Sequence, residues 1–247
     1  MIADMPIPLP PLAEQRAIAA ALADVDGLLA ALDVLIVKKR AVKTAAMQQL
    51  LTGKTRLPGF SGEWVTRRLG EITECLDHLR VPLNEKQRAS MPGPYPYCGA
   101  NGVLDYINDY LIDDDVILLA EDGGYFDQYA DRPIAYRMTG KIWVNNHAHV
   151  LKALPGYSQG FIFYSVVHKN ILPYLASGTR AKLNRSEMDK IEVYLPVEYD
   201  EQESIAAVLS DMDAEIAALE ARRQKVRQIK QGMMQVLLTG KVRLVTL

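Results

Sequence analysis

The chain has only two cysteines among its 247 residues, and no uninterrupted apolar run approaches the roughly 18 residues of a membrane-spanning helix. Cys75 and Cys98 fit neither a metal motif nor a disulfide framework, so both are expected to be packing residues in a reducing compartment. Residues 1–11 lack the charged start and long apolar stretch of a secretory signal. These absences predict a cytoplasmic protein with no membrane partner.

Motifs that would indicate an enzyme are also missing. There is no glycine-rich cofactor loop after a strand, no Asn-Pro-Pro-Tyr segment of an amino-methylating DNA methyltransferase, and no serine elbow or Cys/His nucleophile pattern. Gly53-Lys54-Thr55 resembles the end of a phosphate-binding loop, but Gln48 stands where that motif needs a glycine. We therefore expect no catalytic residue and no cofactor in this chain.

Charge is nearly balanced overall but unevenly distributed. The formal net charge is −2, which does not indicate a chain coated with basic residues. Residues 104–131 contain nine acidic residues and no lysine or arginine, whereas residues 132–190 contain nine basic and two acidic residues. This asymmetry predicts a basic face on an acidic domain, the alternative being that the charges only solvate separate loops.

A long internal repeat is the strongest signal in the sequence. Residues 14–57 align without a gap to residues 201–244, at an offset of 187, with 23 identities in 44 positions. The order is therefore repeat, insert, repeat.

Each copy of the repeat is predicted to be one long helix of about 38 residues. The apolar spacing of four and three is typical of a coiled-coil seam, which is expected to shift in the second half of each copy toward Val42, Met47, Val226, Ile229 and Met233. Helix ends are indicated by Pro10 and Pro11, by a capping box at Asp200 and Glu203, and by Gly53 and Gly240. An antiparallel pair is the simplest way to cover both stripes, with the insert at one tip.

The insert has the pattern of a mixed domain in which strands predominate. Short apolar runs at 116–120, 141–144, 149–151 and 191–195 predict strands, and helices are expected at 160–167 and 185–190. The loops between them are rich in Gly, Asn, Tyr and Ser, which are turn formers but also groups that hold phosphates or read base edges. His147 and His149 would share one face of a strand, but no third metal ligand is evident. We therefore predict no metal site and expect a hydrogen-bonded structural or backbone-contacting role for both histidines.

Four segments together resemble the specificity (S) subunit of type I restriction-modification enzymes. They are IPLPPLAEQRAI at 7–18, LLTGK at 50–54, LPGFSGEW at 57–64 and LGEI at 69–72. GTRAKL at 178–183, followed by residues 188–196 and 201–202, is similar to the exit of a target-recognition domain in that family. The resemblance extends over essentially the whole chain.

The resemblance implies an α+β fold, with one mixed α/β target-recognition domain at the tip of a long antiparallel two-helix coiled coil. The expected divisions are a terminal strand remnant of a missing recognition domain at 1–11, a first conserved helical repeat at 12–57, the recognition domain at 58–200 and a second repeat at 201–247. Residues 1–11 align with the strand and proline that end the insert, so the chain resembles a half-equipped specificity subunit.

The implied function is sequence-specific binding of double-stranded DNA, with one half of a bipartite target read by this chain. The expected DNA contacts are Tyr97, Asn101, Tyr125, Asn145, Asn146, His147, Lys152, Ser177, Thr179, Arg180, Lys182, Asn184 and Arg185. Catalysis would belong to partners: methyltransferase subunits with S-adenosylmethionine, and a restriction subunit (endonuclease and translocase) that uses ATP and Mg. Self-association or a complementary specificity fragment would supply the second half-site.

The helical repeats are expected to dock the partner subunits. The residues assigned to these docking helices are Ile18, Leu22, Leu29, Leu32, Ile205, Leu209, Ile216 and Leu219. Two other functions remain open from the sequence: a coiled-coil adaptor whose insert binds protein through the acidic 104–131 region, and an enzyme that uses His147, His149 and nearby carboxylates.

Overall fold

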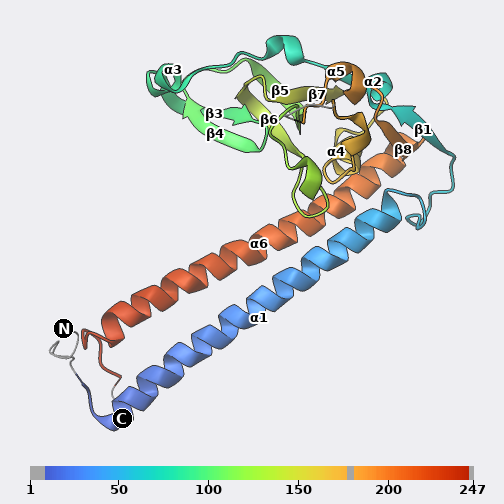
Figure 1. The fold of residues 1–247 in the computed structure, drawn as a ribbon. Coiled ribbons are helices and arrows are strands. Elements are labelled where there is room, and N and C mark those ends of the chain that lie inside the picture. Colours follow the sequence, from blue (N-terminus) through green and yellow to red (C-terminus); the bar gives the residue numbers. More distant parts are fainter. Residues whose placement is uncertain (1–8, 177–180, 245–247) are drawn as a thin grey trace. The chain divides into compact units, whose positions relative to one another are not determined.

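The computed structural model describes residues 9–176 and 181–244, and its two longest elements are helices (Figure 1). Helices α1 (Leu12–Leu50) and α6 (Tyr199–Leu237) contain 39 residues each, close to the predicted 38. The shorter helices are α2 (Leu69–Ile72), α3 (Glu85–Ala89), α4 (Gln159–Val166) and α5 (Arg185–Met188). The strands are β1 (Trp64–Arg68), β2 (Thr73–Cys75), β3 (Pro92–Gly99), β4 (Gly102–Ile107), β5 (Ile112–Ala120), β6 (Ala135–Val144), β7 (Ala148–Ala153) and β8 (Glu192–Pro196).

By internal contacts the chain divides into two units. One comprises residues 1–45 with 210–247, and the other comprises residues 46–209. The first holds most of both long helices, and the second holds the sheets together with the adjoining helix ends. The predicted α+β class is confirmed. None of the helices in the described part of the chain is apolar over a length that would cross a membrane.

In the first unit α1 and α6 lie side by side and run in opposite directions (Figure 1). Lys43 of α1 pairs with Asp213 of α6 at 2.5 Å, and Asp26 pairs with Lys230 at 2.6 Å. Because the partner number falls on α6 as the number rises on α1, the pair is antiparallel, as the repeat predicts.

Charge polarity explains this direction. Residues 199–221 include seven acidic and no basic residues, whereas residues 222–237 include five basic and no acidic residues. In α1, residues 12–33 carry four acids and one base, and residues 34–50 carry four bases and no acid. Antiparallel pairing places each acidic half against a basic half, whereas parallel pairing would oppose like charges. Each helix also carries acids near its N-terminus and bases toward its C-terminus, which suits the helix dipole.

The seam between the helices does not shift along their length. Of the five residues expected there, Val226 is buried and Met47 and Met233 are half-buried. Val42 and Ile229 are 47% and 50% exposed, so the expectation was wrong for these two. The spacing of four and three continues instead through positions held by cations, whose long stems pack while their charged ends reach acids of the other helix. The second-half seam positions are Ile36, Lys39, Lys43, Ala46 and Leu50 in α1, and Arg223, Val226, Lys230, Met233 and Leu237 in α6.

The eight residues expected on the docking helices occupy the first half of the same seam. Five of them are less than 9% exposed, with Ile205 and Leu209 completely buried, and the other three are half-buried. These side chains are buried between the two helices, so a partner subunit would have to contact other faces of the pair.

Both copies of the repeat end in the same way. Gly53 and Gly240 adopt left-handed backbone conformations, with φ of +66° and +70°, as the sequence predicts. The start of α6 differs from expectation: the helix begins at Tyr199, so Asp200 lies in its first turn rather than at its cap. The carboxylate there still interacts favourably with the helix N-terminus.

One ion pair is made twice by the duplicated sequence. In the second unit Arg56 donates from Nε to Glu201 at 2.5 Å and from Nη2 at 2.6 Å. In the first unit Arg243 donates from Nε to Glu14 at 2.7 Å and from Nη2 at 2.5 Å. Arg243 is Arg56 shifted by 187 positions, and Glu201 is Glu14 shifted likewise. The helix pair thus has an approximate two-fold relation between its copies.

The second unit contains a six-stranded sheet in the order β2-β7-β5-β6-β3-β4 and a two-stranded sheet of β1 with β8. Pairing in the large sheet is antiparallel except between β3 and β6. Three of the four predicted strand runs fall within observed strands, and the fourth, 191–195, begins one residue before β8. The two predicted short helices match α4 and α5 within about two residues at each end.

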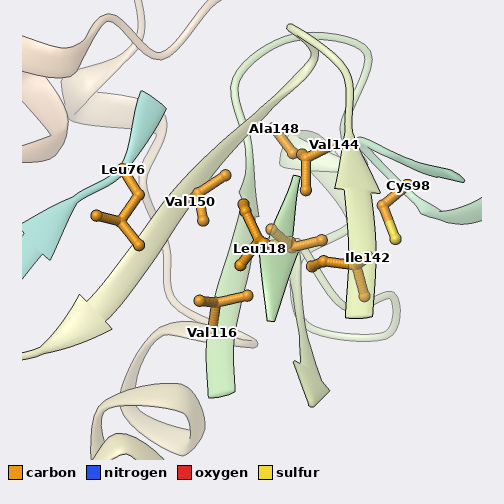
Figure 2. Close-up of a cluster of buried hydrophobic side chains, with 9 residues drawn as sticks. Leu76, Cys98, Val116, Leu118, Ile142, Val144, Ala148 and Val150 are labelled. Carbon is orange, nitrogen blue, oxygen red and sulfur yellow. The ribbon is translucent and has the colours of Figure 1, made fainter. Parts of the chain in front are cut away.

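Side chains from several strands converge on one apolar core (Figure 2). Leu118 and Val150 are fully buried, as is Cys98, whose pKa is raised to about 11 by burial. A thiol with a raised pKa is a poor nucleophile, so Cys98 is a packing residue, as expected. The same core contains Leu76, Ile112, Val116, Ile142, Val144 and Ala148.

Candidate nucleic-acid interface

The polar loops expected to read a ligand converge on the segment Glu121–Gly123, which follows β5. The amide of Glu121 donates to the carbonyl of His147 at 2.9 Å, and the side chain of Asn101 donates to the carbonyl of Gly123, also at 2.9 Å. The amide of Leu183 donates to the carbonyl of Glu121 at 2.8 Å. Three segments distant in sequence are therefore tied to one loop. We call these four segments, 99–102, 121–125, 145–147 and 181–183, the loop cluster.

The β3–β4 hairpin contributes its tip to the loop cluster. Gly102 adopts φ of +125°, a conformation that favours glycine, and it closes the turn after Asn101. The hydroxyl of Tyr136 donates to the carbonyl of Gly99 at 2.6 Å, which holds the base of the turn. Asn101 is exposed, so its side chain lies at the surface while one amide hydrogen is used internally.

The turn after β6 presents a second polar group. Asn145 is only 4% exposed, and its side chain accepts a hydrogen bond from the amide of His147 at 2.8 Å. Asn146 is exposed, and the imidazole of His147 lies 2.6 Å from Asp122 with 42% of its side chain exposed. Asn145 therefore shapes the turn, while Asn146 and His147 are the side chains that a ligand can reach.

The side chain of Glu121 links the loop cluster electrostatically. Its carboxylate accepts from Arg80 at 2.6 Å and from Lys182 at 2.8 Å. Burial alone raises the pKa of Glu121, but the hydrogen bonds from Lys182 and Arg80 outweigh burial and lower it. Glu121 is 8% exposed, so this is a buried carboxylate held charged by two cations.

His149 completes the network as a buried cation. Its Nδ1 lies 2.6 Å from the carboxylate of Asp77 and its Nε2 lies 2.8 Å from the carbonyl of Leu183. Both partners only accept hydrogen bonds, so both ring nitrogens donate and the ring carries a proton on each. Burial lowers the pKa of His149, but the bonds to Asp77 and Cys75 and the charge of Asp77 together raise it to about 9.

This charge predicts a loss of stability at high pH. Because the folded pKa is raised from 6.5 to about 9, the stabilisation is fully present below 6.5 and is lost as the pH rises through about 9. We expect the wild type to lose on the order of 2 to 3 kcal/mol relative to His149→Gln between about pH 6 and pH 9.5, measured by urea unfolding. His78→Gln, at an exposed histidine, should leave the profile unchanged. An NMR titration of His149 near 6.5 would contradict the charged ring.

Cys75, Asp77 and His149 also form a set that could hold a metal ion. Their ligand atoms lie within 4.8 Å of one another. An ion there would have to displace the hydrogen bond between Asp77 and His149, and it would lie near the cation of Arg80, which is 3.1 Å from Asp77. The imidazole of His147 lies beside a different carboxylate, that of Asp122, so His147 does not take part in this set.

Several predicted contacts lie elsewhere. Tyr97 is 1% exposed and its hydroxyl is used by the backbone of Leu83, so it packs in the core and is not available to a ligand. Lys152 pairs with Asp114 and lines a cavity of about 860 Å³. Tyr125, by contrast, belongs to the loop cluster, and the guanidinium of Arg132 stacks over its ring 3.1 Å from the centroid.

The remaining candidates lie around residues 177–185. Ser177, Thr179 and Arg180 are outside the described residues. Asn184 precedes α5 without a side-chain cap, and Arg185 lies 3.8 Å from Asp189.

Several acids of residues 104–131 pair with bases of residues 132–190. Asp115 of β5 pairs with Arg137 of β6, and Arg137 is bidentate on that carboxylate. Lys182 likewise pairs with Glu121. Antiparallel pairing of β5 with β6 and β7 brings some acids of one segment next to bases of the other, and the separate basic face stays a prediction.

Sequence reasoning missed the residues that hold the loop cluster together. Arg80, Asp77 and Glu121 were not singled out. For His149 a hydrogen-bonded structural role was expected in preference to metal binding, and its contacts with Asp77 and with the carbonyl of Leu183 agree with that expectation. The sequence signal that could have identified Glu121 is its position directly after the apolar run 116–120, where a carboxylate is expected to be buried. Its partners lie 41 and 61 positions away and have no local pattern.

Solved structures of specificity subunits share this fold. The S subunit of a type I restriction-modification system from M. genitalium superposes with a TM-score of 0.69 at 18% identity, over 92% of this chain and 61% of that one. The HsdS subunit from Thermoanaerobacter tengcongensis gives a TM-score of 0.55 at 16% identity, over 96% of this chain and 61% of that one. At such identities the likeness defines the fold class alone.

The sequence itself identifies the family. Residues 61–228 match the type I restriction modification DNA specificity domain, and this chain belongs to that family. A putative type I restriction enzyme specificity subunit from Haemophilus influenzae is 32% identical over 57% of this chain and 34% of its own length. The putative MjaX specificity subunit from Methanocaldococcus jannaschii is 26% identical over 97% of this chain and 60% of its own length. The chain spans about a third to three fifths of these curated relatives.

Proposed function

We propose that this chain binds double-stranded DNA sequence-specifically and reads one half of a bipartite target through the loop cluster. The observation that carries the proposal is the convergence of exposed Asn101 and Asn146 and half-buried His147 around Glu121–Gly123 in a member of a DNA specificity family. Amide and imidazole groups hydrogen-bond base edges in the major groove, and a buried network behind them keeps them in place.

Chemistry would belong to other subunits. We infer that methyltransferase subunits carrying S-adenosylmethionine and a restriction subunit using ATP and Mg dock on faces of the helix pair outside its seam. A solved structure with a TM-score of 0.54 is described in terms of the complex assembly of a type I restriction-modification system, and this description supports the expectation of docked subunits. The second half-site would need another recognition domain, from a second copy or a complementary fragment. Such a chain functions in the cytoplasm.

The test is selection of bound duplexes from a random library, using the full chain with its methyltransferase subunit. We expect one enriched half-site, with affinity that falls as salt rises because phosphate contacts release counterions. Asn146→Ala and His147→Ala should each weaken binding about tenfold and relax one position of the half-site. Asn170→Ala, at an exposed asparagine on another turn, is the matched control. An unenriched library at every salt concentration would refute sequence-specific reading.

A further inference from the structure

Strand β4 contains a bulge at which two neighbouring apolar side chains are both exposed. Tyr97 of β3 pairs with Asp105 of β4. The next residue, Cys98, pairs with Val103, so Leu104 has no residue opposite it. Neighbouring residues of a regular strand point to opposite faces, and an extra residue breaks this alternation. Val103 and Leu104 are 40% and 59% exposed, and we call these two residues the apolar bulge.

Protection of a sheet edge does not explain the apolar bulge. β4 is the last strand of the six-stranded sheet, and a bulge at such an edge keeps other chains from pairing with it. Edges that are protected in this way carry charged residues or proline, whereas large apolar side chains make an edge more prone to association. A valine and a leucine at this position therefore indicate a ligand that covers them.

The apolar bulge lies against the loop cluster. A Cβ at Gly99 would lie 2.7 Å from Cδ1 of Leu104 and 3.2 Å from Nδ2 of Asn145, so the leucine methyl and the asparagine amide border the same glycine. Asn101, one of the exposed groups of the loop cluster, lies three positions before Leu104 in the same hairpin. A duplex that is read by Asn101 is therefore within reach of Leu104.

We propose that Leu104, supported by Val103, contacts the C5 methyl group of a thymine in the half-site. This inference rests on the proposed function and assigns one base to it. The thymine methyl is the apolar group that a base pair presents in the major groove, whereas the amide and imidazole groups of the loop cluster suit donors and acceptors. Leu104 adds the apolar contact that those groups do not make. Phosphates are a poor partner for it, because an apolar side chain would remove water from their charges.

The surroundings of Leu104 favour DNA over a protein partner. The carboxylate of Asp105, the next residue, lies 3.1 Å from Nε of Arg88, so the charge nearest to Leu104 along the strand is paired and repels phosphates less. A protein could also cover a valine and a leucine. However, the position of Leu104 over Gly99 places the apolar bulge beside the groups that would read bases, and one ligand then accounts for both surfaces.

Replacement of thymine by uracil tests the contact, because uracil pairs with adenine in the same way and lacks only the methyl group. The full chain with its methyltransferase subunit first selects its half-site, and each thymine of that half-site, on either strand, is then replaced in turn by uracil. At one position the wild type should bind the uracil duplex about fourfold more weakly, which is the effect expected for burial of one methyl group.

Leu104→Ala should bind the thymine and uracil duplexes equally at that position, because its side chain is too short to reach the methyl group. Leu104 is 59% exposed, so this variant should keep the wild-type circular dichroism spectrum. Val197→Ala is the matched control. Val197 is 56% exposed and follows β8 of the two-stranded sheet, and this variant should keep the fourfold difference.

The outcomes separate this inference from the proposed function. A selected half-site in which no uracil replacement weakens wild-type binding would overturn the thymine contact and leave sequence-specific reading intact. A uracil effect that persists in Leu104→Ala would also overturn it. So would a Leu104→Ala chain that keeps wild-type discrimination but loses its methyltransferase subunit, since the apolar bulge would then bind protein. A library that stays unenriched at every salt concentration would overturn both proposals.

Discussion

Glu121→Ala should lower the free energy of unfolding by about 3 kcal/mol, one of the two largest losses that we expect from any substitution considered. The carboxylate of Glu121 accepts from Arg80 and Lys182 and lies 3.8 Å from His149. Without it Arg80, whose side chain is 15% exposed, and buried His149 share a single remaining anion, Asp77. An uncompensated buried cation is costly, and partial screening by solvent keeps the loss near the lower end of the usual range.

Urea unfolding measures this loss, and Asp114→Ala provides the comparison. Asp114 also pairs with a lysine, Lys152, but the two side chains are 35% and 43% exposed. An ion pair of this kind contributes less than about 1 kcal/mol. We also expect Glu121→Ala to weaken half-site selection, because Lys182 loses its ion pair, although the backbone bond from Leu183 to residue 121 remains. Equal losses in the two variants would mean that the network contributes no more than a surface pair.

Gly93→Ala should destabilise the β3–β4 hairpin by about 3 kcal/mol. Gly93 lies in a bulge, since Pro92 and Tyr95 both pair with Ile107. A Cβ at Gly93 would contact the Cα of Asn108 and lie 2.6 Å from the carbonyl carbon of Ile107. These are backbone atoms within a hydrogen-bonded pair of strands, so they cannot move aside without breaking the bulge.

Gly99→Ala is the matched control at the other end of the same strand. A Cβ there would lie 2.7 Å from a methyl carbon of Leu104, a flexible side chain that is 59% exposed and free to rotate away. We expect a loss of about 1 kcal/mol. Hydrogen exchange of the β3 and β4 amides should report the difference, with fast exchange in Gly93→Ala alone. Comparable exchange in both variants would show that the bulge adapts.

The parts of the fold that could be predicted are those with a local periodicity or an internal copy. The seam through Ile18 and Leu32 recurs at Ile205 and Leu219, and this recurrence predicts two paired helices. The error concerned Val42 and Ile229, which are apolar in both copies and look like seam residues. The periodicity of apolar residues cannot show that the seam continues through Lys43 and Lys230. A lysine stem packs there because its charged end reaches an acid of the other helix.

The loop cluster was predictable in its members but not in its arrangement. Asn101, Asn146 and His147 could be selected because turn residues with amide or imidazole groups suit DNA. Their convergence depends on Glu121, which contacts Arg80 from 41 positions away, and on Asp77, which contacts His149 from 72 positions away. Such pairings follow from strand order, and strand order does not follow from local sequence.

The pairing of β1 with β8 has a consequence for how the helices find each other. Asp33 and Arg223 are 190 positions apart, so closing the helix pair from an unfolded chain carries a large loop entropy. Once β1 has paired with β8, with Trp64 opposite Pro196, the path between the helices along the chain shortens to the residues around 51–63 and 197–198. A non-local contact thereby becomes a nearly local one, which speeds its formation. We therefore expect the insert to form first and the helices to close afterwards, as in a hairpin.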